Sequence, residues 1–402
     1  MTDDPFARWK LTPVINASGT MTGIGASRVP DDERAAVDRI LAAFVDMDEL
    51  QSRAGAIIAR VTGAEAGCVA SCSAAAMTQT IAACLTGANL AKIEALPTVT
   101  GERRVLLPMG HMVNYGAPVD QAIRLAGAEV VPVGTAAACE TWHLANALAE
   151  GAAAAMYVVS HHTVRENELP MDVFIELCRE HGVPVIVDMA SEYDLTGPIA
   201  LGASAAIYSG HKFLSGVTSG IVAGTSDLIR ATYLQHRGIG RTMKAGKESV
   251  VGAMAALEMW EGRDHAAARR AEDGRVALWM RELADIPGLS VAPHADWTGN
   301  PITRVRVTIT PQSAGFLAWA LAERLAARTP RILVRDDLIE RQEFYLDPCN
   351  LTDEEAAVVA AAIREEAERF RVSRDGCRAS WSDIKRAREA AILAWSGAGD
   401  AS

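Results

Sequence analysis

Two short stretches in the middle of the chain decide the fold: Val183-Pro-Val-Ile-Val-Asp188 and Ile207-Tyr-Ser-Gly-His-Lys-Phe-Leu214. The first is an apolar, β-branched run that ends in an acidic residue, which is typical of a buried strand in a parallel sheet. The second carries a short apolar run, residues 205–208, into a turn that contains Lys212. Asp188 and Lys212 would then both lie at the sheet edge where open α/β folds bind ligands.

An aspartate and a lysine placed in this way have a specific chemical use. A lysine can form a Schiff base with pyridoxal 5'-phosphate (PLP), and an acidic partner keeps the pyridinium nitrogen protonated, so that the ring accepts electrons. Taken singly, Lys212 is as well explained by a solvated loop and Asp188 by a strand-end cap. The joint pattern favours the cofactor, and we predict that both residues bind PLP and are catalytic.

The cofactor phosphate needs a cradle, and residues 62–77, Thr-Gly-Ala-Glu-Ala-Gly-Cys-Val-Ala-Ser-Cys-Ser-Ala-Ala-Ala-Met, offer one. Small residues at a helix start let a phosphate reach free N–H groups, where the helix dipole also favours negative charge. An ordinary Ser-capped helix would explain the same residues. With the aspartate and lysine downstream, phosphate binding is the preferred interpretation. The predicted ligands are Ser73, Ala74, Ala75 and Ser209, with His211 a weaker candidate.

Composition bounds the class of protein. At 402 residues the chain exceeds one ordinary domain. A net charge of -11 is unlike that of a nucleic-acid binder. No apolar stretch reaches the length of a membrane span, and the start, Met-Thr-Asp-Asp-Pro, does not resemble a signal peptide. We expect a cytoplasmic protein with a small-molecule substrate, no nucleic-acid or membrane partner, and reduced cysteines.

The pair His161 and His162 is the one sequence feature that suggests a metal. On a strand, adjacent residues point to opposite faces, so these two side chains would not chelate one ion together. We therefore expect no metal site.

Several segments together resemble a known family. They are Ile15-Asn-Ala-Ser-Gly-Thr20, Thr62-Gly-Ala-Glu65, Ser71-Cys-Ser-Ala-Ala75, Pro108-Met-Gly-His-Met-Val-Asn-Tyr-Gly116, Val187-Asp-Met-Ala190, Ser209-Gly-His-Lys212 and Gly238-Ile-Gly-Arg-Thr-Met-Lys-Ala-Gly-Lys-Glu248. The set resembles the fold-type I PLP enzymes and, more narrowly, the group related to bacterial selenocysteine synthase. Within that group it is most similar to D-glucosaminate-6-phosphate ammonia-lyase-like proteins. The resemblance covers roughly residues 10–370.

The resemblance implies residue roles and an assembly. Lys212 would carry the cofactor, Asp188 would bind the pyridine nitrogen, and Ser73 and its neighbours would hold the phosphate. His111 would stack on the ring or stand beside it and is the third predicted catalytic residue. Cys72 departs from the family, whose members often have a smaller residue there. His211 stands where selenocysteine synthase-type proteins tend to have an acidic residue, which favours the ammonia-lyase-like branch. A homodimer, or a multiple of one, is expected from fold analogy.

The implied architecture is an aspartate aminotransferase-like α/β fold with a mainly parallel, seven-stranded type of sheet and a small α+β domain. We expect an N-terminal arm over residues 1–30, a large PLP-binding domain over 31–260, a small C-terminal domain over 261–375 and a helical tail over 376–402. Strands are predicted at residues 104–107, 128–133, 154–159, 183–187, 205–208 and 219–223, and in the small domain at 289–291, 303–309 and 331–334.

The resemblance implies an α,β-elimination that releases ammonia from a hydroxy amino acid or an amino sugar acid and leaves a 2-oxo acid. Racemase, aldolase and selenocysteine synthase-like transferase chemistry stay open, as does a regulatory PLP-binding protein. Anionic substrate groups would suit the basic segment with Arg237, Arg241, Lys244 and Lys247, unless it is a solvated turn. Arg335 is a second candidate, unless it pairs with Asp336 or Asp337. The predicted substrate-binding residues are Arg241, Lys244, Arg335 and Tyr115.

Overall fold

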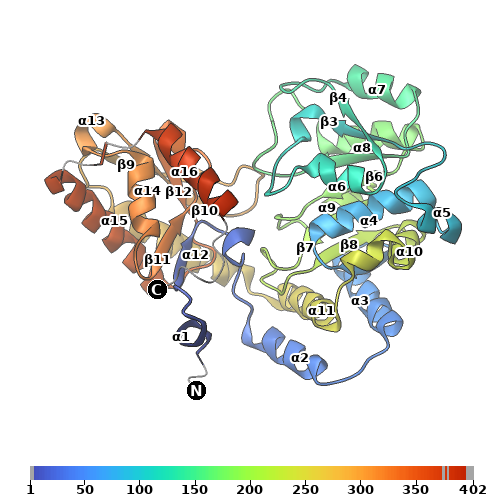
Figure 1. Cartoon of the computed structure of the whole chain (residues 1–402), viewed down its shortest axis with the longest axis horizontal. Helices are drawn as coiled ribbons and strands as arrows, with labels where there is room; N and C mark the ends of the chain where they lie inside the picture. The colour runs from blue at the N-terminus through green and yellow to red at the C-terminus, as the bar shows by residue number, and fades with distance from the viewer. Residues whose placement is uncertain (1–3, 374–375, 378–379, 395–402) are drawn as a thin grey trace. The chain divides into compact units, whose positions relative to one another are not determined.

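The computed structural model describes residues 4–373, 376–377 and 380–394 (Figure 1). They form two compact units. The central unit comprises residues 25–263, and the terminal unit comprises the residues up to Ile24 together with those from Asp264 onward. The N-terminal segment, which we expected to be a separate arm, is thus part of the terminal unit.

A seven-stranded sheet organises the central unit (Figure 1). Its strands, in spatial order, are β2 (Ala66–Ala70), β8 (Gly220–Gly224), β7 (Ala205–Ser209), β6 (Val185–Asp188), β5 (Ala154–Val158), β3 (Arg104–Pro108) and β4 (Glu129–Val133). The five strands from β7 to β4 are parallel, and β8 runs antiparallel to both of its neighbours. The predicted mainly parallel sheet is confirmed. Strand β2 is an addition, because its residues were assigned only to the predicted phosphate cradle, residues 62–77, and not to a strand.

Helices cover both faces of this sheet, because side chains alternate between two cores along each strand. Leu106, Ala155 and Val187 pack into the core formed with α3 (Met47–Thr62), α7 (Thr141–Ala149), α8 (Met171–Glu180) and α11 (Lys247–Gly262). Val105, Ala154 and Ile186 pack into the core formed with α4 (Ser73–Thr86), α6 (Val119–Leu125) and α10 (Ser226–Leu234). The other helices of the unit are α2 (Asp31–Leu41), α5 (Leu90–Ala95) and α9 (Gly197–Ala200).

The terminal unit is a small α+β domain with its own core. Strand β10 (Thr303–Ile309) pairs antiparallel with β9 (Leu289–Ala295) and β12 (Glu343–Leu346), while β1 (Val14–Ala17) pairs in parallel with β11 (Arg331–Val334). The pairing of β1 with β11 explains why the N-terminal segment belongs to this unit. Its helices are α1 (Pro5–Trp9), α12 (His265–Glu282), α13 (Pro311–Ala314), α14 (Ala318–Ala326), α15 (Asp353–Ser373) and α16 (Trp381–Ala394).

The predicted helical tail is represented by α16, while its Gly-Ala-Ser-rich end, residues 395–402, lies outside the described residues. Among the helices that the structure describes, none has both the length and the apolar composition needed to span a membrane.

A buried ion-pair network ties the terminal unit together. The Arg304 guanidinium, 2% exposed, donates from Nε to Asp347 Oδ2 at 2.6 Å and from Nη1 to Asp296. Burial alone would raise the pKa of both carboxyl groups, but the Arg304 charge lowers it below the usual value. Asp347 Oδ1 also accepts a hydrogen bond from the backbone N–H of Cys349. The backbone N–H of Asp347 donates to Ala17 O at 2.9 Å. The network therefore joins β10 and β12 to β1.

Replacing Arg304 with alanine should destabilise the terminal unit strongly, because two carboxylates would stay buried without their cation. We expect a loss of about 3–5 kcal/mol in the free energy of unfolding, measured by denaturant titration. Arg281→Ala is the matched control, since Arg281 pairs with Glu282 at the surface of the same unit and its loss should cost less than about 1 kcal/mol. Equal effects of the two substitutions would contradict the role of the network.

Candidate active site

The sheet brings the chemically interesting side chains of the central unit to one edge. Strands β3, β5, β6 and β7 are parallel, and β2 runs in the same direction because two antiparallel pairings separate it from β7. The residues that follow these strands therefore meet at a common edge. They are Ser71–Ser73 after β2, the 3₁₀ turn Met109–His111 after β3, Asp188 at the end of β6, and Ser209–Lys212 at the end of β7.

Asp188 is the buried acidic group of this edge. It is 6% exposed, and its Oδ1 accepts a hydrogen bond from Ala190 N at 3.1 Å. Burial raises the pKa of Asp188 to about 6, although the Ala190 hydrogen bond and the positive charge of Lys212 both oppose the increase. Lys212 is therefore near enough for its charge to act on the Asp188 carboxyl group, and the two residues lie at or just after the ends of the neighbouring parallel strands β6 and β7. The structure thus brings Asp188 and Lys212, two of the three residues predicted to be catalytic, to the same sheet edge, and the third, His111, lies at this edge in the turn after β3.

The phosphate cradle predicted after β2 is a helix N-terminus. Helix α4 begins at Ser73, and Cys72 is its N-cap, with Sγ accepting from Ala75 N at 3.4 Å. The amide of Ala75, predicted to bind phosphate, therefore already has a partner, whereas those of Ser73 and Ala74 have no acceptor within the helix. Strand β8 lies tightly against this turn: a Cβ at Gly220 would fall 2.2 Å from Cys72 O.

His111 is buried and neutral. It is 2% exposed, its ring meets that of Tyr157 edge-on at 4.4 Å between centroids, and its Nδ1 accepts a hydrogen bond from Val158 N at 3.2 Å. A ring nitrogen that accepts from a backbone N–H carries no proton, so the proton of the neutral ring is on Nε2. Burial lowers the pKa of His111 to about 4.

Tyr115, predicted to bind substrate, lies near the same carboxyl group. Burial raises the pKa of its phenol to about 12, and the negative charge of Asp188 contributes to the increase. The phenol is therefore protonated at neutral pH. Because Tyr115 is 39% exposed, its side chain also reaches solvent. A phenol in this position can donate a hydrogen bond to a bound molecule.

Ser209 and His211 are held by the turn itself. Ser209 is 2% exposed, and its Oγ lies 3.4 Å from His211 Nδ1. Burial lowers the pKa of His211, and the charge of Lys212 lowers it further. The backbone carbonyl of His211 accepts from Ser27 Oγ at 2.7 Å. A phosphate role for either side chain remains a prediction.

The basic segment lies beside the phosphate turn. Residues Ile239–Met243 form a 3₁₀ turn, and Met243 O accepts from Ser71 N at 3.4 Å and from Gln79 Nε2 at 3.2 Å. Arg241 and Lys244 flank this contact and are exposed.

Lys247 has a different function from the anion binding suggested by its sequence context. Its Nζ donates to Leu41 O at 2.9 Å and to Ala43 O, so it caps the carboxyl end of α2.

Arg335 belongs to the terminal unit. It is 6% exposed, donates from Nε to Asp337 Oδ2 at 2.8 Å, and lies over the Trp297 ring at 4.9 Å. The alternative interpretation, an ion pair with Asp337, is observed. In this pair the Arg335 side chain is buried, whereas the Asp337 side chain is partly exposed.

The strand that we expected to point the side chains of His161 and His162 to opposite faces is not observed. Both residues lie in a turn after β5, and their ring centroids are 3.7 Å apart. The absence of a metal site stays a prediction, but the strand geometry of His161 and His162 no longer supports it.

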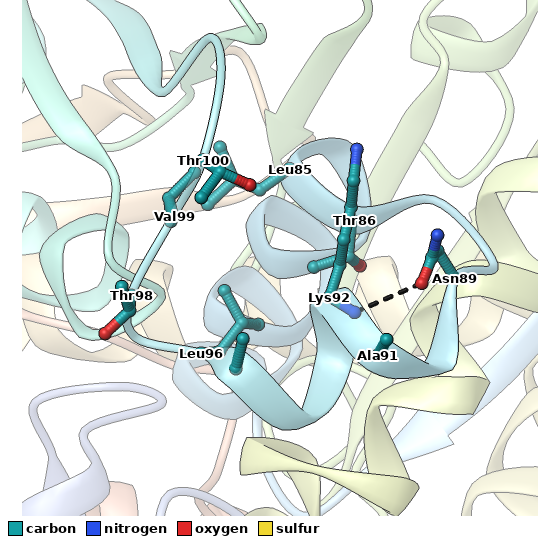
Figure 2. A pocket seen from close by; sticks show the side chains of 10 residues that line it. Leu85, Thr86, Asn89, Ala91, Lys92, Leu96, Thr98, Val99 and Thr100 are labelled. Atoms are coloured by element: carbon teal, nitrogen blue, oxygen red, sulfur yellow. Dashed lines mark hydrogen bonds between the residues drawn. The ribbon is translucent and has the colours of Figure 1, made fainter.

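A pocket of ≈ 220 Å³ lies elsewhere in the central unit, at the carboxyl end of α4 and along α5 (Figure 2). Leu85, Thr86, Lys92, Leu96 and Val99 are among the side chains that line it. Helix α4 has 14 residues, which places its two ends about 20 Å apart. The pocket is therefore separate from the phosphate turn.

Two features of the site escaped sequence analysis. Cys72 was noted only as a departure from the family, yet its sulfur caps α4. Gly220 was interpreted as an ordinary strand residue, yet only a hydrogen at that position lets β8 approach the turn. The cap could have been predicted from Cys72, a short residue directly before a helical run. The close approach of β8 could not, because Gly220 and Cys72 are about 150 positions apart in the sequence and no local pattern connects them.

The protonation state of His111 is directly testable. In the cofactor-free, ¹⁵N-labelled protein, long-range ¹H–¹⁵N spectra should show His111 as the Nε2–H tautomer and should show no protonation until the pH approaches about 4. His111→Gln assigns the signals. A signal that titrates near pH 6.5 would contradict the buried, acceptor geometry.

The chain is similar to proteins of known type. The family model of L-seryl-tRNA selenium transferase (SelA) matches residues 14–271. D-glucosaminate-6-phosphate ammonia lyase of Salmonella typhimurium is 36% identical over 369 residues, covering 92% of this chain and 99% of the relative. The 5'-C-glycyluridine monooxygenase-decarboxylase of Streptomyces sp is 36% identical over 355 residues, covering 87% and 88%. A solved structure of D-glucosaminate-6-phosphate ammonia-lyase has a TM-score of 0.82 at 35% identity and covers 92% of this chain and 99% of that one.

Proposed function

The chain belongs to the L-seryl-tRNA selenium transferase family of PLP-dependent enzymes and has their fold-type I architecture, and we propose that it is a PLP-dependent ammonia-lyase. The reaction is an α,β-elimination on a hydroxy amino acid or an amino sugar acid. The observation that carries the proposal is the placement of the buried Asp188 and of Lys212 at the ends of the neighbouring parallel strands β6 and β7. The near full-length match to D-glucosaminate-6-phosphate ammonia lyase supports the choice of reaction.

The residues present fit PLP. A buried carboxyl group whose pKa of about 6 exceeds its usual value is stabilised by a cationic N–H group, which the protonated ring nitrogen of the cofactor provides. The first-turn amides of α4 and the Ser73 hydroxyl suit a phosphate. Lys212 would hold the cofactor covalently, Asp188 would bind its ring nitrogen, and His111 would contribute a buried, uncharged ring beside it.

When bound, PLP delocalises the electron pair that is left on Cα after a bond to that carbon breaks. Lys212, displaced by the substrate amine, takes the Cα proton as general base. The leaving hydroxide needs a proton, and the Lys212 ammonium, which has just received one, can return it. Tyr115, protonated and close to Asp188, can hold the leaving oxygen by a hydrogen bond. After the loss of water, Lys212 would displace the product nitrogen and so regain its bond to the cofactor. The released enamine would tautomerise to an imine, and hydrolysis of the imine by water would give the 2-oxo acid and ammonia.

Recognition of an anionic substrate group falls to Arg241 and Lys244, which flank the contact between the 3₁₀ turn and Ser71. Their exposure leaves both side chains free to move toward a carboxylate or phosphate. Arg335 is proposed as a further anion ligand, and its stacking on Trp297 would keep the guanidinium oriented. The protein is further proposed to act in the cytoplasm, on a small molecule, as a homodimer or a multiple of one.

The cofactor and the reaction can be tested together. The purified protein with PLP should show a visible absorbance band that borohydride removes, with the label on Lys212, and amino sugar acids or hydroxy amino acids should release ammonia and a 2-oxo acid in equal amounts. Lys212→Ala should abolish turnover, a loss of at least about 10³-fold, because it removes both the cofactor bond and the base.

The other outcomes of this assay are also informative. Oxygen consumption with release of carbon dioxide would indicate monooxygenase-decarboxylase chemistry in place of ammonia release. Inversion at Cα without ammonia would indicate a racemase. A protein that shows no visible band after PLP is added would contradict the proposed function altogether.

The packing of β8 against the phosphate turn gives a second test. A Cβ at Gly220 would meet Cys72 O at 2.2 Å and Ser73 N at 2.9 Å, so Gly220→Ala must displace the turn. Overpacking of this kind costs about 1–3 kcal/mol, and we expect the Kd for PLP, measured by equilibrium dialysis, to rise about 10-fold or more.

Gly224→Ala is the matched control for this substitution. Gly224 lies in the same strand and is equally crowded, with a Cβ position 2.4 Å from Ser204 O, but it is at the opposite end of β8. The control should lower stability and leave the Kd for PLP unchanged. A similar rise in Kd for both variants would show that the phosphate does not bind at the α4 turn.

A further inference from the structure

One buried carboxyl group lies beside the loop that carries Lys212. Glu33 is in the first turn of α2, next to Asp31 and Asp32, but its side chain is 0% exposed whereas theirs face solvent. Burial raises the pKa of Glu33 to about 7, although a hydrogen bond from the Val217 backbone opposes the increase. Burying a carboxyl group is unfavourable unless it makes compensating interactions, so this position calls for a specific role.

The interaction that Glu33 makes is with the loop backbone. Its Oε1 accepts a hydrogen bond from Val217 N at 2.9 Å, five residues after Lys212. Its Oε2 is buried and has no hydrogen-bond partner among the residues that the structure describes. The carboxyl group is therefore committed to one contact, and that contact fixes the outgoing end of the Lys212 loop.

The loop itself, residues 210–217, is closed by its own backbone. Gly216 N donates to Gly210 O at 2.7 Å, and Ser215 N donates to Lys212 O at 2.9 Å. The incoming end is held by Ser27 Oγ through the carbonyl of His211. The chain segment from Ser27 to Glu33 thus anchors both ends of the loop.

Two glycines make room for the carboxyl group. A Cβ at Gly216 would lie 3.0 Å from Glu33 Oε1 and 2.8 Å from the Cβ of Ala256. A Cβ at Gly252 in α11 would lie 3.2 Å from the same oxygen and 2.2 Å from Val217 Cγ2. The carboxyl group therefore lies in a narrow space between the 210–217 loop and α11. Any movement of this group toward Gly216 or Gly252 would be limited by the backbone of the loop or of α11.

We propose that Glu33 is a positioning residue for Lys212, which acts by holding the 210–217 loop against α2 and α11 so that the lysine stays opposite Asp188. The inference rests on the proposed role of Lys212 in binding the cofactor. Glu33 acts through the loop backbone, and its Oε1 supplies the acceptor that the Val217 amide would otherwise lack.

Hydrogen exchange in the cofactor-free protein tests the contact directly. In Glu33→Ala the Val217 amide should exchange about 10-fold faster or more, because its acceptor is gone. In Glu33→Gln the amide oxygen can accept the same bond, so exchange should stay within about threefold of the wild-type rate. Asp32→Ala, which changes the exposed neighbour in the same helical turn, is the control and should leave the Val217 amide unaffected. Unchanged exchange in Glu33→Ala would overturn the proposal.

Kinetics of the loaded enzyme separate positioning from a purely structural role. A misplaced lysine should lower kcat by about 10- to 100-fold with a smaller change in KM, and Glu33→Gln should restore most of kcat. If Glu33→Ala does not fold, Glu33→Leu keeps the space filled while removing the acceptor, and the same expectations apply. A lower melting temperature with unchanged kcat would assign Glu33 to stability alone and overturn the proposal. A wild-type protein without a borohydride-trapped Lys212 would instead contradict the proposed function.

Discussion

The attraction between Asp188 and Lys212 is the interaction on which the site depends. The carboxyl group is buried at the end of β6, where desolvation raises its pKa to about 6 even with the lysine and a backbone N–H in opposition. A nearby cation favours the charged form of this buried carboxyl group, which is the form that would bind a cationic ring. Lys212 sits on a loop rather than a strand, so the loop needs anchors, and the structure provides them in Ser27 and Glu33.

Sequence patterns predicted most of the strands because burial leaves a clear signal. The apolar run before Asp188 and the period-two alternation of Thr303–Ile309 both correspond to observed strands. Strand β2 was missed because its residues, Ala-Gly-Cys-Val-Ala, have weak strand propensity. Tertiary contacts make it a strand: the Gln51 side chain donates to Val69 O at 2.8 Å and accepts from Val69 N at 3.0 Å, and Gly67 lies against Ile58. Such contacts have no local signature.

The same distinction applies to the site. Asp188 and Lys212 were predicted together because Asp188 ends one recognisable strand and Lys212 lies in the turn that follows another, and these two strands are neighbours in the sheet. Glu33 was not found, since an acidic residue in the first turn of a helix is ordinary, and its partner lies 184 residues away. Lys247 was misinterpreted for the related reason that a basic side chain in a Gly-rich segment resembles an anion site. Its actual partners are carbonyl groups more than 200 residues earlier in the chain.

Two relatives that are equally similar to this chain carry the names of different reactions, an ammonia lyase and a monooxygenase-decarboxylase. The shared fold therefore does not select the bond that breaks, and the selection must come from the side chains that line the site of each protein. In this chain burial keeps His111 neutral and Tyr115 protonated, so neither is a strong base near neutral pH. In the proposed mechanism, proton abstraction falls to Lys212, and the placement of this lysine sets which substrate bond lies within its reach. On the same proposal, the hydrogen bond between the Val217 amide and the buried Glu33 carboxyl group would act on the reaction through the loop that carries Lys212, and this role would offset the unfavourable desolvation of Glu33.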